Sequence, residues 1–307
     1  MGQEVLTLAA PKIKEMKKHY HAYLEKTPQG AVFRAKTPYA VITAYHSGKV
    51  LFQGSQPEKE STQWKSKSAI TQAKKTKHSP NIDTAIFQKN HIGSDESGTG
   101  DYFGPITVAA VFATKEQQFQ LKQLGVVDSK NLKDDVIQDI AQEILKLPIS
   151  YTILKLGNEK YNHLQNKGWS QGKMKAMLHH HAIDRLIKKL NGSAYGGIVI
   201  DQFCEPAVYK RYLQSEALKL HENTTFITKA ESHSINVAAA SILARARFVT
   251  AMDKLSEEAG IILPKGASSK VDKVAANYIR THGEQQLGHV AKLHFANTNK
   301  AKKYLQE

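Results

Sequence analysis

The stretch SDESGTGDYFGP, Ser94–Pro105, is the most informative part of the sequence, because two acids stand directly before a glycine-rich turn. One apolar run leads into this turn and a second follows it, so the pattern predicts strands over His91–Asp95 and Ile106–Ala113. Asp95 and Glu96 are expected at the end of the first strand, pointing in different directions. The glycines of the turn permit positive φ and let the backbone approach a ligand closely.

Alternating strand and helix signals continue from Ile82 towards the C-terminus, which indicates an α/β domain. Further strands are predicted over Ile149–Leu156, Gly197–Asp201 and Thr225–Lys229. Helices are predicted over Lys133–Leu147, Gly172–Leu190, Pro206–Leu220, Ser234–Glu258 and Val271–Gln286.

Two more acids follow predicted strands of this domain: Asp201 closes GGIVIDQF, and Glu231 follows TTFITKA. Ligand sites in open α/β sheets gather beyond strand ends, so both are expected to converge with Asp95 and Glu96. Carboxylate oxygens suit Mg²⁺ or Mn²⁺, and two such ions would clamp the attacking and leaving oxygens of a phosphodiester. For any one acid alone, a capping role is the simpler interpretation. Their joint placement favours the metal site.

The chain is strongly basic, with 43 Lys/Arg and 28 Asp/Glu among 307 residues, a net charge of +15 and a pI near 9.6. Residues 1–90 hold 15 basic and 6 acidic residues, or +9. Such a surplus predicts a polyanionic partner, although it also serves solubility alone. A catalytically silent nucleic-acid-binding protein would account for this charge, but it would leave the acids unexplained.

The first third of the chain reads as a small α+β domain. An amphipathic helix is expected over Lys12–Glu25, followed by a meander of strands over Ala31–Ala35, Tyr39–Tyr45 and Lys49–Gln53. The predicted division is an N-terminal substrate-binding domain over 1–66, a basic polar linker over 67–88 and the α/β domain over 89–307.

The last strand of the meander contains candidate contacts to nucleic acid, Lys49 for a phosphate and Phe52 for an apolar surface. Alternation puts Val50 and Phe52 on one face and Leu51 on the other, so one of these sets must be core. The sequence leaves open which one.

A single cysteine, Cys204, excludes an intramolecular disulfide framework and fits a reducing compartment. The N-terminus lacks a signal-peptide pattern, and the apolar runs look too short to span a membrane. A cytoplasmic monomer without a membrane association or an obligate protein partner is the resulting expectation.

Four ordered motifs resemble the type 2 ribonucleases H, and the ribonuclease HIII family most closely. They are DESGTGDYFGP from Asp95, VVDSKNL from Val126, VIDQF from Val199 and KAESHSINVAAASILAR from Lys229. The resemblance implies an RNase H-like fold with a mixed sheet flanked by helices, preceded by a small domain similar to the TATA-binding protein. It also implies divalent metal and endonucleolytic cleavage of the RNA strand in RNA/DNA hybrids, leaving 5′-phosphate and 3′-hydroxyl ends.

The resemblance assigns Asp95, Glu96, Asp201 and Glu231 as the four catalytic acids. Glu205 is a rival for the fourth role, because it follows Asp201 by four residues and helical spacing would turn it to the same side.

The resemblance further implies that Gly98, Thr99 and Gly100 contact ribose 2′-hydroxyls and that Ser129 and Lys130 touch phosphates. A helix-capping turn is an alternative for Ser129. Thr99 stands where ribonuclease HII usually has Arg, which weakens the rival reading that this protein incises single ribonucleotides embedded in DNA.

Several reactive side chains are not assigned to the site. The consecutive His179, His180 and His181 spread about 100° apart on a helix and are expected at a solvated or half-buried surface. Cys204 is expected to be a small buried hydrophobe, and a structural hydrogen bond is the preferred role for His233.

Overall fold

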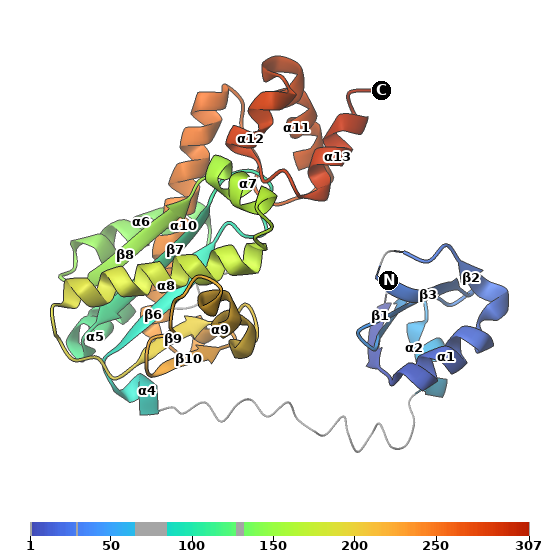
Figure 1. Cartoon of the computed structure of the whole chain (residues 1–307), viewed down its shortest axis with the longest axis horizontal. Helices are drawn as coiled ribbons and strands as arrows, with labels where there is room; N and C mark the ends of the chain where they lie inside the picture. Colours follow the sequence, from blue (N-terminus) through green and yellow to red (C-terminus); the bar gives the residue numbers. More distant parts are fainter. Residues whose placement is uncertain (1, 29, 65–84, 127–131, 307) are drawn as a thin grey trace. The chain divides into compact units, whose positions relative to one another are not determined.

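The computed structural model describes residues 2–28, 30–64, 85–126 and 132–306, and the chain divides into two compact units, Met1–Ile82 and Asp83–Glu307 (Figure 1). Each unit has its own five-stranded sheet. Most of the predicted linker falls outside the described residues.

The N-terminal unit is an antiparallel sheet with helices. Its strands, in the order β1-β5-β4-β3-β2, are β1 (Gly2–Thr7), β5 (Lys49–Gly54), β4 (Ala40–Tyr45), β3 (Ala31–Lys36) and β2 (Leu24–Glu25). Its described helices are α1 (Ala10–His19) and α2 (Pro57–Ser61), with single 3₁₀ turns over His21–Tyr23 and Thr62–Trp64. The predicted meander is confirmed, whereas β1 was not predicted.

The first helix ends at His19, six residues before the predicted end. The chain leaves the helix at Tyr20, whose side chain is almost fully buried and whose hydroxyl bonds Glu60 Oε2 at 2.9 Å and Trp64 Nε1 at 2.9 Å. These partners lie 40 and 44 residues away, so the sequence near the helix does not reveal them.

One face of the N-terminal sheet forms the core of this unit. Phe33, Ile42 and Phe52 are fully buried there, with Met16 of α1 packed against them. Leu51, on the opposite face of β5, is half-buried. The prediction that Phe52 contacts nucleic acid is therefore wrong, because the odd-numbered residues of β5 face outward.

The second unit contains a mixed sheet in the order β10-β9-β6-β7-β8. Its strands are β6 (His91–Ser97), β7 (Ile106–Ala113), β8 (Ser150–Leu156), β9 (Ile198–Asp201) and β10 (Thr224–Ile227). The β6, β7 and β8 strands are antiparallel, while β9 runs parallel to both β6 and β10. The five predicted strands and the mixed α/β architecture are confirmed.

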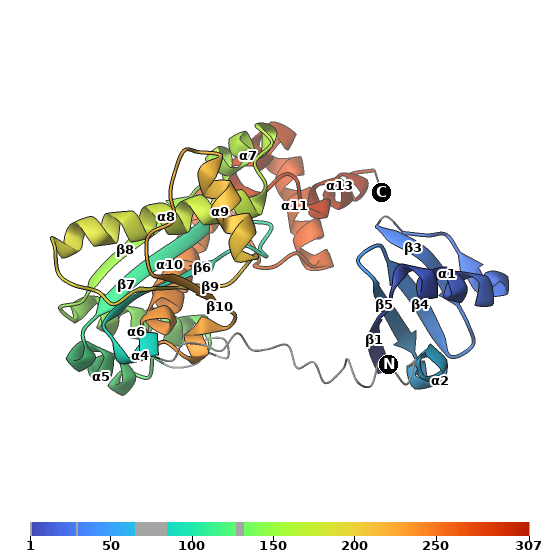
Figure 2. The ribbon, with the colours of Figure 1, turned by 60° about the horizontal axis from the view of Figure 1, so that its bottom comes forward.

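Helices cover both faces of this sheet, with α8 crossing one face and α10 lying behind the other (Figures 1 and 2). The described helices of this unit are α4 (Ala85–Gln88), α5 (Lys115–Gln123), α6 (Asp134–Lys146), α7 (Asn158–Asn166), α8 (Gln171–Leu190), α9 (Pro206–Gln214), α10 (Ile235–Ala259), α11 (Ser269–His282), α12 (Leu287–Val290) and α13 (Ala296–Lys303). The helix α9 ends six residues before its predicted end, and the chain turns through positive φ at Ala217. The polar helices α5, α7 and α13 were not predicted, because they have few apolar residues.

The contact between β6 and α10 is unusually close. A Cβ atom on Gly93 would lie 2.3 Å from the backbone nitrogen of Val237. Ala238, Ala239 and Ala240 follow on α10 and are all buried, which confirms the predicted close-packing face. Small side chains on both elements thus let the helix lie directly on the strand.

Within the described residues, α10 is also long and apolar enough to cross a membrane, so the expectation of no such run was too strong. In this fold 67% of its apolar window is buried. Burial of this extent is typical of a core helix.

Candidate active site

Asp95 and Asp201 lie side by side on neighbouring strands. In the parallel pair of β6 and β9, Ser94 is in register with Ile200, so Asp95 and Asp201 occupy the next positions. Asp201 is the last residue of β9, as predicted, whereas β6 continues past Asp95 to Ser97. The predicted strand end at Asp95 is wrong, because β6 stays paired with the antiparallel β7 there.

Glu231 lies on a third element, the 3₁₀ turn Ala230–Ser232 between β10 and α10. The backbone N–H of Ala230 donates to Asp201 Oδ1 at 2.8 Å, which joins this turn to the end of β9. Glu231 is 5% exposed. Glu205, by contrast, lies exposed at the N-cap of α9.

The crowding of these acids perturbs Asp95. Burial raises its pKa to about 8, and the charges of Glu96 and Asp201 add to this effect against the hydrogen bond from Ser241. Burial is the larger cause of this shift, and a bound cation would oppose it by favouring the charged carboxylate.

Glu96 points to the opposite side of β6, as expected for adjacent strand residues. Its Oε1 accepts from Lys175 Nζ at 2.7 Å, and its Oε2 accepts from His179 Nε2 at 2.8 Å. Burial acts to raise the pKa of Glu96, but the hydrogen bond and charge of His179, together with Lys175, bring it below the ordinary value. Both partners come from α8.

These four carboxyl groups, Asp95, Glu96, Asp201 and Glu231, make up what we call the four-acid site. They supply only oxygen ligands, which suits a hard divalent cation. Among the described residues, no three His, Cys, Asp or Glu side chains already form a metal cage. In this structure, Glu96 is paired with Lys175 and His179 of α8.

The glycine-rich loop begins immediately beyond Glu96. Gly98 has φ of 87°, and a Cβ atom there would lie 2.3 Å from the carbonyl oxygen of Pro105. Any other residue would be both strained and obstructed. Gln171 Nε2 of α8 donates to the Thr99 carbonyl oxygen at 2.9 Å, and Gly100 is exposed.

The far side of this loop is anchored by Lys292, which sequence reasoning did not single out. Its buried ammonium donates to the carbonyl oxygens of Asp101 at 2.7 Å and Gly104 at 2.6 Å. Burial lowers the pKa of Lys292 to about 7. No local pattern near residue 292 reveals this role, because the loop lies almost 190 residues earlier.

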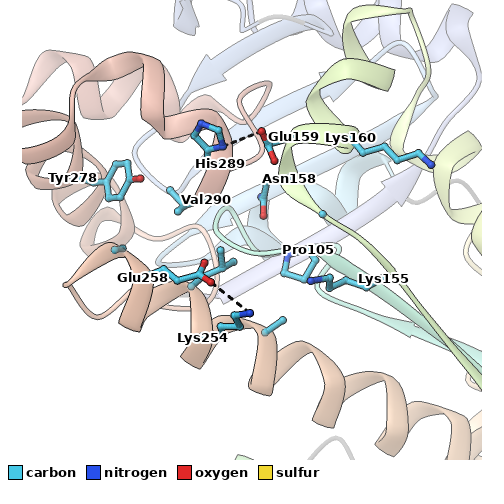
Figure 3. Close-up of a pocket in the computed structure, with 14 residues that line it drawn as sticks. Pro105, Lys155, Asn158, Glu159, Lys160, Lys254, Glu258, Tyr278, His289 and Val290 are labelled. Atoms are coloured by element: carbon cyan, nitrogen blue, oxygen red, sulfur yellow. Dashed lines mark ion pairs between the residues drawn. The ribbon is translucent and has the colours of Figure 1, made fainter.

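Behind the loop lies a cavity of about 500 Å³ between α7, α10, α11 and α12 (Figure 3). Asn158, which lines it, donates Nδ2 to the Gly104 carbonyl oxygen at 2.9 Å. Glu258 pairs with Lys254 at 3.6 Å, and Glu159 pairs with His289 at 3.0 Å. The cavity therefore supports the loop, and its carboxylates already have partners in Lys254 and His289.

Ser129 and Lys130 lie outside the described residues. Just after them, the Leu132 carbonyl oxygen accepts from Arg245 at 2.8 Å, and Asp134 pairs with Arg245 at 2.9 Å. The described part of this segment is therefore fastened to α10, the helix that carries Ser241.

The three consecutive histidines of α8 have different surroundings. The expectation of a solvated or half-buried surface is wrong for His179, which is fully buried against β6 and contacts Glu96. His180 is also buried and stacks on His221 with ring centroids 4.7 Å apart, while His181 is exposed. The three residues differ because α8 packs on the sheet on one side and against the segment that carries His221 on another, whereas His181 faces solvent.

Two other side chains remain outside the site. Cys204 is half-buried, and burial raises the pKa of its thiol. His233 is exposed and stacks against Phe87 with centroids 6.3 Å apart.

In the N-terminal unit, Lys49 is exposed on the outward face of β5.

Comparison with known proteins gives two matching families. The model of the family described as Ribonuclease HII matches residues 92–298, and that of Domain of unknown function (DUF3378) matches residues 3–78. Ribonuclease HIII from Oceanobacillus iheyensis is 63% identical over 99% of this chain and 100% of its own length. Ribonuclease HIII from Bacillus licheniformis is 50% identical over 99% and 98%, respectively.

Solved structures agree with the sequence relatives. The crystal structure of Bst-RNase HIII in complex with Mn²⁺ matches with a TM-score of 0.71 and 40% identity, over 99% of both chains. The ribonuclease H2 from Pyrococcus horikoshii matches with a TM-score of 0.56 and 19% identity, over 71% of this chain and 99% of its own. The second likeness shows a shared fold.

Proposed function

Because this chain belongs to the ribonuclease HIII family, whose members cleave the RNA strand of RNA/DNA hybrids, we propose that its four-acid site holds the divalent ions for that cleavage. The chain is accordingly an endonuclease of the ribonuclease H type. The observation that supports the proposal is the placement of Asp95 and Asp201 side by side on β6 and β9, with the turn that carries Glu231 joined to the end of β9.

The donor set fits Mg²⁺ or Mn²⁺, and the structure of Bst-RNase HIII with Mn²⁺ supports a divalent ion in a relative. Two bound ions would activate the attacking water and stabilise the departing 3′-oxygen, which leaves 5′-phosphate and 3′-hydroxyl ends. Asp95 and Asp201 would hold them from adjacent strands, Glu231 from the turn before α10, and Glu96 from the opposite side of β6.

The glycine loop is proposed to distinguish RNA from DNA. Gly98 allows the tight turn, and the exposed Gly100 leaves the backbone open to a ribose. Backbone groups of Gly98, Thr99 and Gly100 would then contact 2′-hydroxyls near the cleaved bond. Ser129 and Lys130 are proposed to contact neighbouring phosphates.

The outward face of the N-terminal sheet is proposed to bind the hybrid. Arg34 and Lys36 of β3 and Lys49 of β5 are all on this face, with Leu51 between the charged positions. Lysine and arginine contacts to phosphates supply affinity without reading sequence. We further propose a monomer in the cytoplasm, a location consistent with the single cysteine.

The test compares cleavage of a labelled RNA/DNA hybrid by Asp201→Asn and by the unchanged chain, in Mg²⁺ and in EDTA. Asp201→Asn is expected to lose cleavage by about a thousandfold and to bind the hybrid equally well or more tightly, because one repelling charge is gone. EDTA should abolish cleavage by the unchanged chain.

Glu222→Gln is the matched control, since Glu222 is an exposed acid outside the proposed site. It should cleave at the normal rate. Full activity of Asp201→Asn, or cleavage in EDTA, would refute the assignment of the site.

A further inference from the structure

The helix α8 presents three polar side chains to the site at intervals of one turn: Gln171, Lys175 and His179. Residues four apart lie on the same face of a helix. Gln171 holds the Thr99 carbonyl oxygen, while Lys175 and His179 each hold one oxygen of Glu96. One helix face therefore fixes both the glycine loop and one acid of the site.

His179 is held from two sides. Its Nδ1 lies 2.8 Å from the Ser94 hydroxyl, which donates to the Ala109 carbonyl oxygen at 2.8 Å. Its Nε2 lies 2.8 Å from Glu96 Oε2. Glu96 therefore lies between the ammonium of Lys175 and the ring of His179.

The two partners of Glu96, Lys175 and His179, differ in their freedom to move. His179 is fully buried, is held by Ser94 and stacks on Phe203 with centroids 5.4 Å apart. Lys175 has a long flexible stem, and its ammonium lies 4.0 Å from the centre of the Phe203 ring. A cation over an aromatic face retains part of its stabilisation. Lys175 can therefore leave Glu96 and remain over Phe203, whereas His179 stays in place.

We propose that Lys175 is an internal counter-ion of Glu96, which neutralises the site when divalent ions are absent and which a divalent ion displaces. His179 positions Glu96 throughout. The inference rests on the proposed function, because it takes Glu96 to be a metal-binding acid. In this arrangement Lys175 competes with the metal, and it prevents a buried cluster of acids from destabilising the ion-free protein.

The experiment measures Mn²⁺ binding by calorimetry, without nucleic acid, for the unchanged chain and for Lys175→Met. Methionine keeps most of the packing of the lysine stem and removes the charge. Lys175→Met is expected to bind Mn²⁺ about tenfold more tightly, since a positive charge beside the ligand oxygen is lost. In EDTA its melting temperature should fall, and saturating Mn²⁺ should close that gap.

Lys188→Met is the matched control, because Lys188 lies on the same helix in an exposed pair with Asp184 at 2.8 Å. It should leave Mn²⁺ affinity unchanged. Lys175→Arg keeps the charge and should also bind Mn²⁺ nearly normally. In a Glu96→Gln background, Lys175→Met should no longer change the affinity, because the competing partner is gone.

Unchanged or weaker Mn²⁺ binding by a Lys175→Met protein that melts normally in Mn²⁺ would overturn the proposal. An equal loss of melting temperature with and without Mn²⁺ would reduce Lys175 to a packing role and would also overturn it. Failure of the proposed function has a separate signature, which is cleavage by Asp201→Asn.

Discussion

The two five-stranded sheets of this protein use their faces in opposite ways. The N-terminal sheet buries one face under α1 and leaves Lys49, Arg34 and Lys36 on the other. The second sheet is covered on both faces, so its reactive groups emerge at one edge, near the ends of β6 and β9. On the open face of the first sheet, the charged side chains are spread over a surface and exposed to solvent. In the covered sheet, a few buried charged side chains lie close together at one place.

The largest effect is expected from shortening a side chain on the buried face of β5, compared with a substitution on its outward face. Phe52→Ala should destabilise the N-terminal unit by about 4 kcal/mol, because it empties a fully buried ring position. Leu51→Ser, on the outward face, should change the free energy of unfolding by less than about 1 kcal/mol. Chemical denaturation of both variants provides the measurement. Equal losses would mean that the two faces are not distinct.

The covered sheet can be probed at its tightest contact. Gly93→Ala would place a Cβ atom 2.3 Å from the Val237 nitrogen and force α10 away from β6. We expect a loss of about 3 kcal/mol in the free energy of unfolding of the second unit, with cleavage reduced because Ser241 moves with the helix. Gly157→Ala is the control, since nothing lies within 4 Å of that position. A stable, fully active Gly93→Ala protein would contradict the close packing.

Removing residues 1–80 should separate binding from chemistry. This segment contains 14 Lys/Arg and 5 Asp/Glu, so hybrid affinity should fall by about tenfold or more and depend less steeply on salt. The cleavage rate at saturating hybrid should stay within a few-fold of normal, because the four-acid site is in the other unit. Fluorescence anisotropy at two salt concentrations measures the affinity, and an unchanged value at both would disprove the role of the N-terminal unit.

The smallest effect is the pH dependence of the free energy of unfolding that arises from His180 of α8. Burial and the nearby His221 and His181 lower the pKa of His180 to about 4, so the unfolded chain binds more protons than the folded one between about pH 4 and 6.5. Stability should therefore rise with pH across this window and be lost as the pH falls towards 4. His180→Gln should reduce this dependence in denaturation curves at pH 5 and 7. An identical pH dependence in both proteins would show that His180 does not titrate in this way.

Local sequence patterns were sufficient for much of the architecture. The apolar run in Ile106–Ala113, the turn at Gly98–Gly104 and the apolar face of Gln171–Leu190 each reflect neighbours within a few residues, so apolar runs, helical period and turn chemistry predict them. The four acids were also visible, because each stands beside a recognisable strand or before a helix. The polar helix α5 and the short strand β1 were missed, because neither has a clear period.

The sequence alone identified the candidate carboxylates of the proposed site, the position of most strands and the basic character of the N-terminal third, because all three depend on local order and composition. Only the tertiary structure decided which face of β5 is buried, that Lys292 anchors the glycine loop and that Lys175 and His179 hold Glu96. Those outcomes depend on partners 79 and 83 residues apart for Glu96 and 188 residues apart for Gly104. Burial and charge pairing of this kind arise from packing between elements that are distant in the sequence, so the pattern of nearby residues does not reveal them.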